Sequence, residues 1–223
     1  MPYGEAPAHA MKKPPPPRPR SRRVVSADTA LARLRAAAAG CRDCALWRAA
    51  TQVVFGEGPA RAQVMLIGEQ PGDAEDRSGR PFVGPAGRLL DRALIDAGID
   101  RSAVYLTNTV KHFKFTPRGK RRLHQRANAQ EQVACRQWLD AEIEQLRPRI
   151  VVCLGAMASR AIFGAAFGLM KQRGQWIALG TERVGIATVH PSYLLRVPDE
   201  DRDRAYREFV ADLRKIQRSI DMP

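Results

Sequence analysis

The regular alternation of short apolar runs with helical patterns is the feature that most restricts how this chain can fold. Four runs of five or six mostly apolar residues predict buried strands: residues 62–67, 103–107, 150–154 and 184–189. Helical patterns lie around them: residues 26–39, 84–98, 128–146, a segment from about 156, and 199–220. Strands that alternate with helices predict a three-layer α/β/α sandwich with a central, mainly parallel sheet.

Polar motifs follow three of the predicted strands. They are G-E-Q-P-G at residues 68–72, N-T-V-K-H at 108–112 and H-P-S at 190–192. Ligands of such sheets bind beyond the carboxyl ends of the strands. We therefore expect these three motifs to share one site.

A strongly basic stretch, residues 110–126, lies between the second strand and the next helix. It contains seven Lys or Arg, no acidic residue and two of the four His of the chain. Most basic runs are solvated surfaces or general phosphate patches. A run that also carries two imidazoles could deliver a nucleophile to a nucleic acid.

The overall charge points to a polyanionic partner. Lys and Arg number 37 against 23 Asp and Glu, a formal net charge of +14. Nucleic acid is the first choice and an anionic membrane the alternative. No apolar run approaches the length of a membrane span, and the N-terminus lacks the pattern of a secretory signal. We expect a cytoplasmic protein.

The chain divides into a tail and one domain. Residues 1–25 contain four consecutive prolines and a cluster of arginines, a composition that favours a disordered basic tail. Residues 26–223 are expected to form a single domain.

The four cysteines suggest a metal site. In a cytoplasmic protein, disulfides are not expected. Cys41 and Cys44 have C-x-x-C spacing, which also suits a redox pair or half of a zinc site. His112, Cys135 and Cys153 are candidates for the remaining ligands. Cys153 lies within an apolar strand, where it is expected to be a core residue.

Several motifs together resemble one enzyme family. They are G-E-Q-P-G (68–72), G-R-P-F-V-G-P-A-G-R-L-L-D (79–91), T-N-T-V-K-H-F-K-F (107–115), K-R-R-L-H (120–124) and H-P-S-Y-L-L-R (190–196). In this combination the chain resembles the UdgX branch of the uracil-DNA glycosylase superfamily, a relative of the iron–sulfur family-four enzymes. The resemblance covers roughly residues 27–218 and implies the uracil-DNA glycosylase fold.

The resemblance implies a [4Fe-4S] cluster held by Cys41, Cys44, His112 and Cys135. Three thiolates and one imidazole suit iron–sulfur chemistry but also suit zinc. Without the family, His112 would be assigned to the surface of a basic loop.

The resemblance also implies how uracil is bound. Phe82 would stack on the base, Asn108 would read its edge with one amide, and His190 would donate to O2 as the glycosidic bond breaks. Gln70 and Asp73 are further substrate-binding candidates, Gln70 through the uracil or through the loop backbone. Taken singly, these residues could equally be core or turn residues.

His124 would then attack C1′ and stay attached to the abasic DNA, with Glu69 orienting it or accepting its proton. We expect the cations at 120–122 to keep His124 neutral. The expected DNA contacts are Lys120, Arg121, Arg122, Ser192 and Arg196. The expected partner is uracil-containing DNA, single-stranded, bound by a monomer without a membrane. Nearby, Glu75 and Asp76 are expected in a solvated acidic turn.

Two other functions fit the same residues. A conventional iron–sulfur glycosylase would release free abasic DNA, and the basic insertion with His124 argues against it. A non-catalytic iron–sulfur nucleic-acid-binding protein would need none of Glu69, Asn108 and His190.

Overall fold

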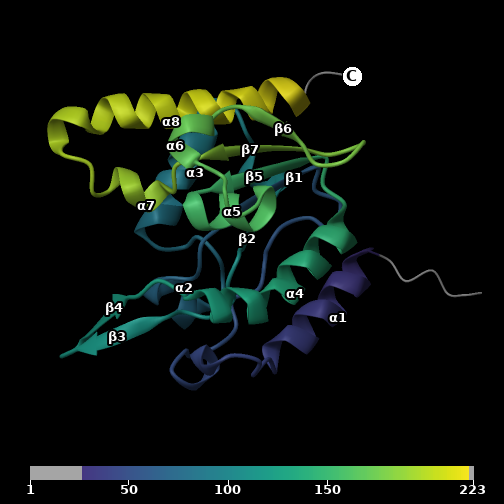
Figure 1. Cartoon of the computed structure of the whole chain (residues 1–223), viewed down its shortest axis with the longest axis vertical. Helices are drawn as coiled ribbons and strands as arrows, with labels where there is room; N and C mark the ends of the chain where they lie inside the picture. The colour runs from purple at the N-terminus through teal and green to yellow at the C-terminus, as the bar shows by residue number, and fades with distance from the viewer. Residues whose placement is uncertain (1–26, 221–223) are drawn as a thin grey trace, which may run out of the picture.

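A single five-stranded sheet forms the centre of the computed structural model, which describes residues 27–220 (Figure 1). Its strands are β1 (Val64–Gly68), β2 (Val104–Asn108), β5 (Ile150–Leu154), β6 (Trp176–Ala178) and β7 (Val184–Thr188). Their order across the sheet is β2-β1-β5-β7-β6, and every neighbouring pair is parallel except β6 and β7 at one edge. The predicted α/β class and mainly parallel sheet are confirmed. The predicted tail, residues 1–25, lies outside the described residues, and the single-domain boundary stays a prediction.

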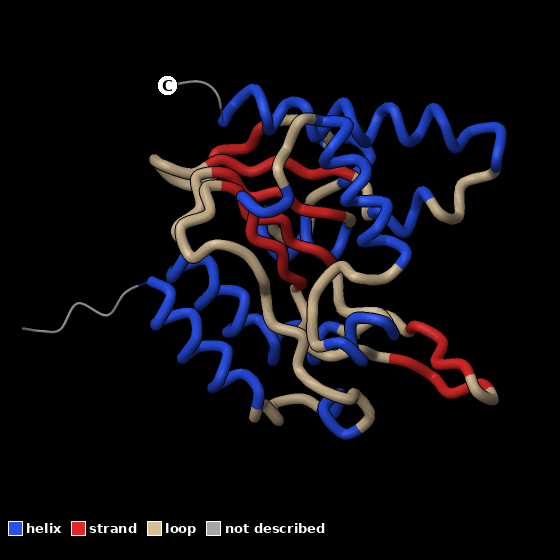
Figure 2. The backbone as a smooth tube through the Cα atoms, turned by 180° about the vertical axis from the view of Figure 1, so that it is seen from behind, coloured by secondary structure: helices blue, strands red, loops and turns tan. Residues whose placement is uncertain are grey.

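Helices cover both faces of the sheet, because the strands are apolar on both faces (Figures 1 and 2). Along β1, Leu66 packs into a cluster with Leu90 and Leu213, whereas its neighbour Met65 packs with Leu139 on the other face. The first face is covered by α3 (Pro85–Ala97), α7 (Pro191–Leu194) and α8 (Asp199–Ile220). The second face is covered by α1 (Ala27–Ala39), α4 (Ala129–Leu146), α5 (Ala156–Phe163) and α6 (Leu169–Gln172). The three layers follow from this two-sided core.

The four predicted strands and five predicted helices are all present, with ends that differ by at most two residues. Cys153 is fully buried in β5, as expected. Besides a hairpin described below, the elements that were not predicted are short: α2 (Asp73–Ser78), α6, α7, β6 and two 3₁₀ turns, η1 (Ala45–Arg48) and η2 (Arg101–Ala103). Among residues 27–220 no helix is long and apolar enough to cross a membrane.

The basic stretch forms a β-hairpin, which the sequence did not predict. Strands β3 (Phe115–Arg118) and β4 (Arg121–His124) pair in antiparallel register, with Phe115 opposite His124. Gly119 sits in the connecting turn with φ of +56°, in the left-handed region that favours glycine. The hairpin extends from the body of the protein (Figure 2). His124 is the last residue of β4 and pairs with the first residue of β3, so it lies at the base of the hairpin.

Candidate active site

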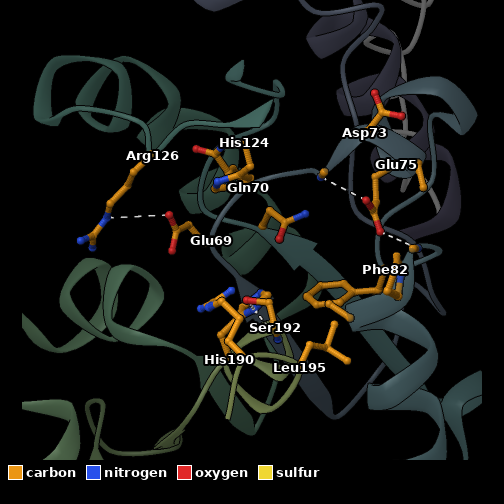
Figure 3. Close-up of a pocket in the computed structure, with 17 residues that line it drawn as sticks. Glu69, Gln70, Asp73, Glu75, Phe82, His124, Arg126, His190, Ser192 and Leu195 are labelled. Carbon is orange, nitrogen blue, oxygen red and sulfur yellow. Dashed lines mark hydrogen bonds and ion pairs between the residues drawn. The ribbon is translucent and has the colours of Figure 1, made fainter. Parts of the chain in front are cut away.

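A cleft of about 760 Å³ opens beyond the carboxyl ends of β1, β2 and β7 (Figure 3). Nine of the residues singled out from the sequence line it: Glu69, Gln70, Asp73, Phe82, Asn108, His124, His190, Ser192 and Arg196. The three polar motifs do share one site, because parallel strands end at one edge of the sheet. The basic hairpin contributes His124 to the same cleft.

Gly68, the last residue of β1, allows Asn108 and Phe82 to approach each other. A Cβ atom at this position would lie 2.4 Å from Asn108 Oδ1 and 2.6 Å from Phe82 Cζ. Both side chains are almost fully buried, at 3% and 5% exposed. Phe82 has φ of +56°, a strained conformation for a residue with a side chain. An amide and an aromatic face therefore meet at the base of the cleft.

His190 caps the N-terminus of α7 and faces the Phe82 ring, with 6.2 Å between ring centroids. The backbone N–H of Ser192 donates to His190 Nδ1 at 3.1 Å, so the neutral ring carries its proton on Nε2. Burial, together with the nearby Arg196 and His124, lowers the pKa of His190 to about 4, and burial is the largest cause. His190 is therefore a neutral hydrogen-bond donor at physiological pH.

His124 reaches the cleft from the end of β4. Part of its side chain remains accessible to solvent, yet desolvation is the largest influence on its pKa and lowers it. Glu69 opposes this shift and Arg196 adds to it. The sequence predicted that the cations at 120–122 keep His124 neutral. Burial is instead the largest cause of the lowered pKa, and the cation that adds to it is Arg196, which also lines the cleft.

The two residues after β1 differ in what they contact. The Glu69 carboxylate lies in the cleft, with Arg126 Nε 3.8 Å away (Figure 3). The Gln70 amide is taken up by the backbone that follows β4. Its Nε2 donates to the Gln125 carbonyl at 2.9 Å, and its Oε1 accepts from the Ala127 N–H at 2.9 Å. Of the two expectations for Gln70, the geometry matches contact with the loop backbone.

Glu75 and Asp76 are buried, at 8% and 0% exposed, so the expected solvated acidic turn is wrong. They belong to α2, whose first turn directs both carboxylates inward. Glu75 accepts from the backbone N–H groups of Gly72 at 3.1 Å and Gly84 at 2.7 Å (Figure 3). It thereby joins the loop of Glu69 to the loop of Phe82.

Arg122 holds the hairpin to α2. Its guanidinium donates to Asp76 Oδ2 at 2.6 Å and to Asp73, and lies 5.3 Å and 5.0 Å from the ring centres of Phe113 and Phe115. Asp73 is thus an ion-pair partner as well as a residue of the cleft. Because Arg122 has these protein partners, its expected role in phosphate binding stays a prediction without support from its geometry.

The other two basic residues of the insertion, Lys120 and Arg121, are exposed. They take part in none of the ion pairs found within residues 27–220. Neighbouring residues of a strand point to opposite faces, so Arg121 faces away from Arg122. The hairpin therefore has one face fixed to the protein and one cationic face in solvent.

Three cysteines gather beside the base of the hairpin. Cys135 on α4 accepts from the Lys111 N–H at 3.1 Å, and Cys41 accepts from the Trp138 indole N–H at 3.1 Å. The pKa of Cys135 is raised to about 11, mainly by burial; Lys111 opposes this shift, and the neighbouring Cys44 and Cys41 add to it. N–H donors aimed at two of the sulfurs suit thiolate ligands.

The fourth expected ligand, His112, is also buried, and burial lowers its pKa. Within residues 27–220, however, no group of three or more His, Cys, Asp or Glu side chains is arranged as a metal site. The types of these side chains thus fit an iron–sulfur cluster. In this structure, however, the four side chains do not converge on one metal site.

The family model of the uracil DNA glycosylase superfamily matches residues 55–214, more than half of the chain and the whole of the cleft. The chain belongs to the uracil-DNA glycosylase superfamily. A Type-4 uracil-DNA glycosylase of Thermotoga maritima is 43% identical over 158 residues, covering 70% of this chain and 78% of that protein. One of Saccharolobus solfataricus is 34% identical over 188 residues, covering 81% and 82%. A Type-5 uracil-DNA glycosylase of Pyrobaculum aerophilum is 34% identical over 155 residues, covering 61% and 64%.

Membership of the glycosylase superfamily agrees with the fold, but two residues of the cleft were missed from the sequence. Glu75 and Arg126 line the cleft but were not predicted as site residues. Glu75 could have been found, because a glutamate three residues after Gly72 is the spacing of a capping box. Arg126 carried no signal beyond its place in the basic stretch.

Proposed function

We propose that this protein excises uracil from DNA and then retains the abasic site as a covalent adduct of His124. Membership of the uracil-DNA glycosylase superfamily and the Type-4 relatives support the excision. The single observation that carries the second step is that His124 lines the same cleft as Asn108, Phe82 and His190.

Excision begins when the uracil nucleotide enters the cleft in an unpaired state. The base stacks on Phe82 while the Asn108 amide pairs with its polar edge. The bond between C1′ and N1 breaks, and its electron pair leaves with the base. The Nε2–H of the neutral His190 donates to uracil O2 and stabilises this charge. The sugar is left with positive charge at C1′.

Capture follows at the same carbon. A lone pair of the His124 imidazole forms a bond to C1′, and the proton of the second ring nitrogen passes to Glu69 or to solvent. The lowered pKa of His124 supports this step, because only the neutral imidazole is a nucleophile. A glycosyl imidazole has no ready route to hydrolysis, so each protein acts once.

The DNA backbone meets cations on both sides of the cleft. Arg196 and Ser192 follow His190, and Lys120 and Arg121 occupy the solvent face of the hairpin. These contacts are independent of sequence and weaken with salt. A single-stranded substrate fits best, since its base is already unpaired, and one monomer supplies the whole site.

We further propose that Cys41, Cys44, Cys135 and His112 hold a [4Fe-4S] cluster. Convergence of three sulfurs and the two N–H···S hydrogen bonds support it. When bound, the cluster supplies a rigid cross-link between the Cys41–Cys44 loop, α4 and the segment that begins the hairpin. It takes no part in bond cleavage.

A denaturing gel of protein mixed with a uracil-containing oligonucleotide tests the proposal. The wild-type protein should give one species that survives heat and SDS, and digestion should place the sugar mass on the peptide around His124. His124→Ala should lose the adduct but still release uracil, because Glu69, Asn108 and His190 remain. Glu69→Gln should impair both steps.

Conventional turnover is the second candidate, and the Type-4 names of the relatives favour it. It would give free abasic DNA with wild-type protein and no heat-stable species. An adduct that persists in His124→Ala would instead assign the nucleophile to another residue. Borohydride separates that case, because a lysine Schiff base needs reduction to survive.

A further inference from the structure

Within residues 27–220, one ion pair, between Lys111 and Glu142, has both side chains almost fully buried. Lys111 follows β2 and Glu142 lies on α4, with side chains 1% and 0% exposed, and Lys111 Nζ is 2.6 Å from Glu142 Oε2. Lys111 is one of the seven basic residues of the stretch 110–126, yet its side chain is buried in the protein. Removing two charges from water is expensive, and apolar residues of similar size would often be equally stable. Stability alone therefore does not explain why the pair is present.

The contacts of the ammonium indicate what the pair does. Besides Glu142, Lys111 Nζ donates to Thr107 Oγ1 and to the main-chain carbonyl of Asn108, both at 2.7 Å. An ammonium has three donors, and all three are used here. Three hydrogen bonds therefore fix the position of the Lys111 ammonium. One of them goes to the main-chain carbonyl of Asn108, whose side-chain amide lies in the cleft.

Glu142 is equally constrained. Its Oε1 accepts from the Gly56 N–H and the Tyr105 hydroxyl, each at 2.9 Å. Its Oε2 accepts from Thr107 Oγ1 at 2.9 Å and from Lys111. Since α4 packs on the sheet, the carboxylate gives Lys111 a rigid support rather than a mobile partner.

The residues after Asn108 are hydrogen-bonded to the segment that contains Glu69. The Thr109 N–H donates to the Gly68 carbonyl at 2.9 Å, and the Val110 N–H donates to the Glu69 carbonyl at 3.0 Å. A shift of the Asn108 backbone would therefore move the Asn108 amide and disturb the hydrogen bonds to Gly68 and Glu69 together.

We infer that Lys111 and Glu142 are positioning residues that fix the Asn108 amide at the depth required for a pyrimidine edge. This inference rests on the proposed role of Asn108 in reading uracil. Neither residue touches the substrate, since both lie behind the wall of the cleft. A displacement of about 1 Å at a reacting site slows the reaction by roughly 100-fold.

The test compares two double variants prepared as the full chain. Lys111→Met/Glu142→Gln removes both charges together, so neither buried charge is left unpaired. Asp91→Asn/Arg101→Met is the matched control, because it removes a partly buried ion pair, of 2.7 Å, that does not line the cleft. Single-turnover uracil excision, affinity for the oligonucleotide and deuterium uptake at Thr109 and Val110 are measured in each.

The first variant should excise uracil on the order of 10- to 100-fold more slowly at saturating DNA. Its affinity should be unchanged, and Thr109 and Val110 should exchange faster in the free protein. The control should keep wild-type excision and exchange at both amides. Thr107→Val, which removes one of the three acceptors of Lys111 Nζ but leaves both buried charges paired, should lie between wild type and the double variant. It also serves if the double variant does not fold.

Two results would overturn the inference: unchanged excision with unchanged exchange in Lys111→Met/Glu142→Gln, or the same loss in the control. Asn108→Ala separates this failure from that of the proposed function. If Asn108→Ala excises uracil at the wild-type rate, then the role of Asn108 is wrong. If only Asn108→Ala is slow, the role of the ion pair is wrong.

Discussion

Replacing Arg122 by glutamine should release the hairpin that carries His124. The buried Asp76 would lose a charged partner, a change that costs about 3–5 kcal/mol in typical buried pairs. The backbone N–H and the hydroxyl of Thr51 still donate to Asp76, so we expect the loss of stability to be near the lower end of this range, about 3 kcal/mol. Contacts with the two Phe rings add about 0.5–1 kcal/mol each in exposed settings. We therefore expect about 4–5 kcal/mol in total.

The matched control is Arg121→Gln, one residue earlier on the opposite face of β4. Its side chain is exposed and has no ion pair within the described part of the chain, so its effect on stability should be within about 0.5 kcal/mol. For a chain of this size, each kcal/mol lowers Tm by roughly 2–4 °C. Arg122→Gln should therefore lower Tm by about 8–20 °C, or by less if the hairpin opens locally before the rest unfolds.

The assay is a time course of the heat-stable adduct, run beside calorimetry and a salt titration of DNA affinity. Arg122→Gln should slow adduct formation more than uracil release, since His124 moves while His190 and Asn108 stay in place. Arg121→Gln should form the adduct normally but bind DNA with a smaller salt dependence. Equal losses of DNA affinity in the two variants, with an unchanged Tm for Arg122→Gln, would refute the anchoring role and make Arg122 a phosphate contact.

The remaining predictions concern protonation and the cysteines. His190 has a folded pKa of about 4 against an ordinary value of 6.5, so the unfolded chain binds more protons between these values. Stability should fall as pH decreases from 6.5 towards 4, and His190→Gln should flatten that slope in urea titrations. Arg196→Ala removes a cation that lowers the pKa of His124, so the acid limb of adduct formation should move to higher pH; an unmoved limb would contradict the pairing. With the proposed cluster bound, the protein should be brown. Cys44→Ala should lose this colour and much of the folded yield, whereas Cys153→Ala should keep it; stoichiometric zinc without iron or sulfide in anaerobic protein would reject the cluster.

The sheet and the cleft could be predicted because both depend on local patterns. A fully apolar run such as Ile150–Leu154 needs two covered faces, and polar residues directly after parallel strands must meet at one edge. Asn108 and His190 were placed by that rule alone.

The direction of the charged side chains could not be predicted in the same way. Lys111, Asp76 and Arg122 are strongly polar, yet each points inward towards a partner far away in the sequence. In a hairpin, a shift of one residue exchanges the two faces, and counting charges in a basic stretch does not reveal the register. Which arginine meets the protein and which meets solvent is decided by the pairing of Phe115 with His124.

The amide of Gln70 has a consequence for how the segment after His124 can vary. The Gln70 amide forms hydrogen bonds with main-chain atoms of Lys114, Gln125 and Ala127. The side chain at 125 can therefore change without the loss of these bonds. The number of residues is not free, since an insertion or deletion between 124 and 127 would bring the wrong carbonyl or N–H opposite the amide. Homologues that keep His124 should therefore tolerate substitutions there but conserve the spacing between His124 and the following helix.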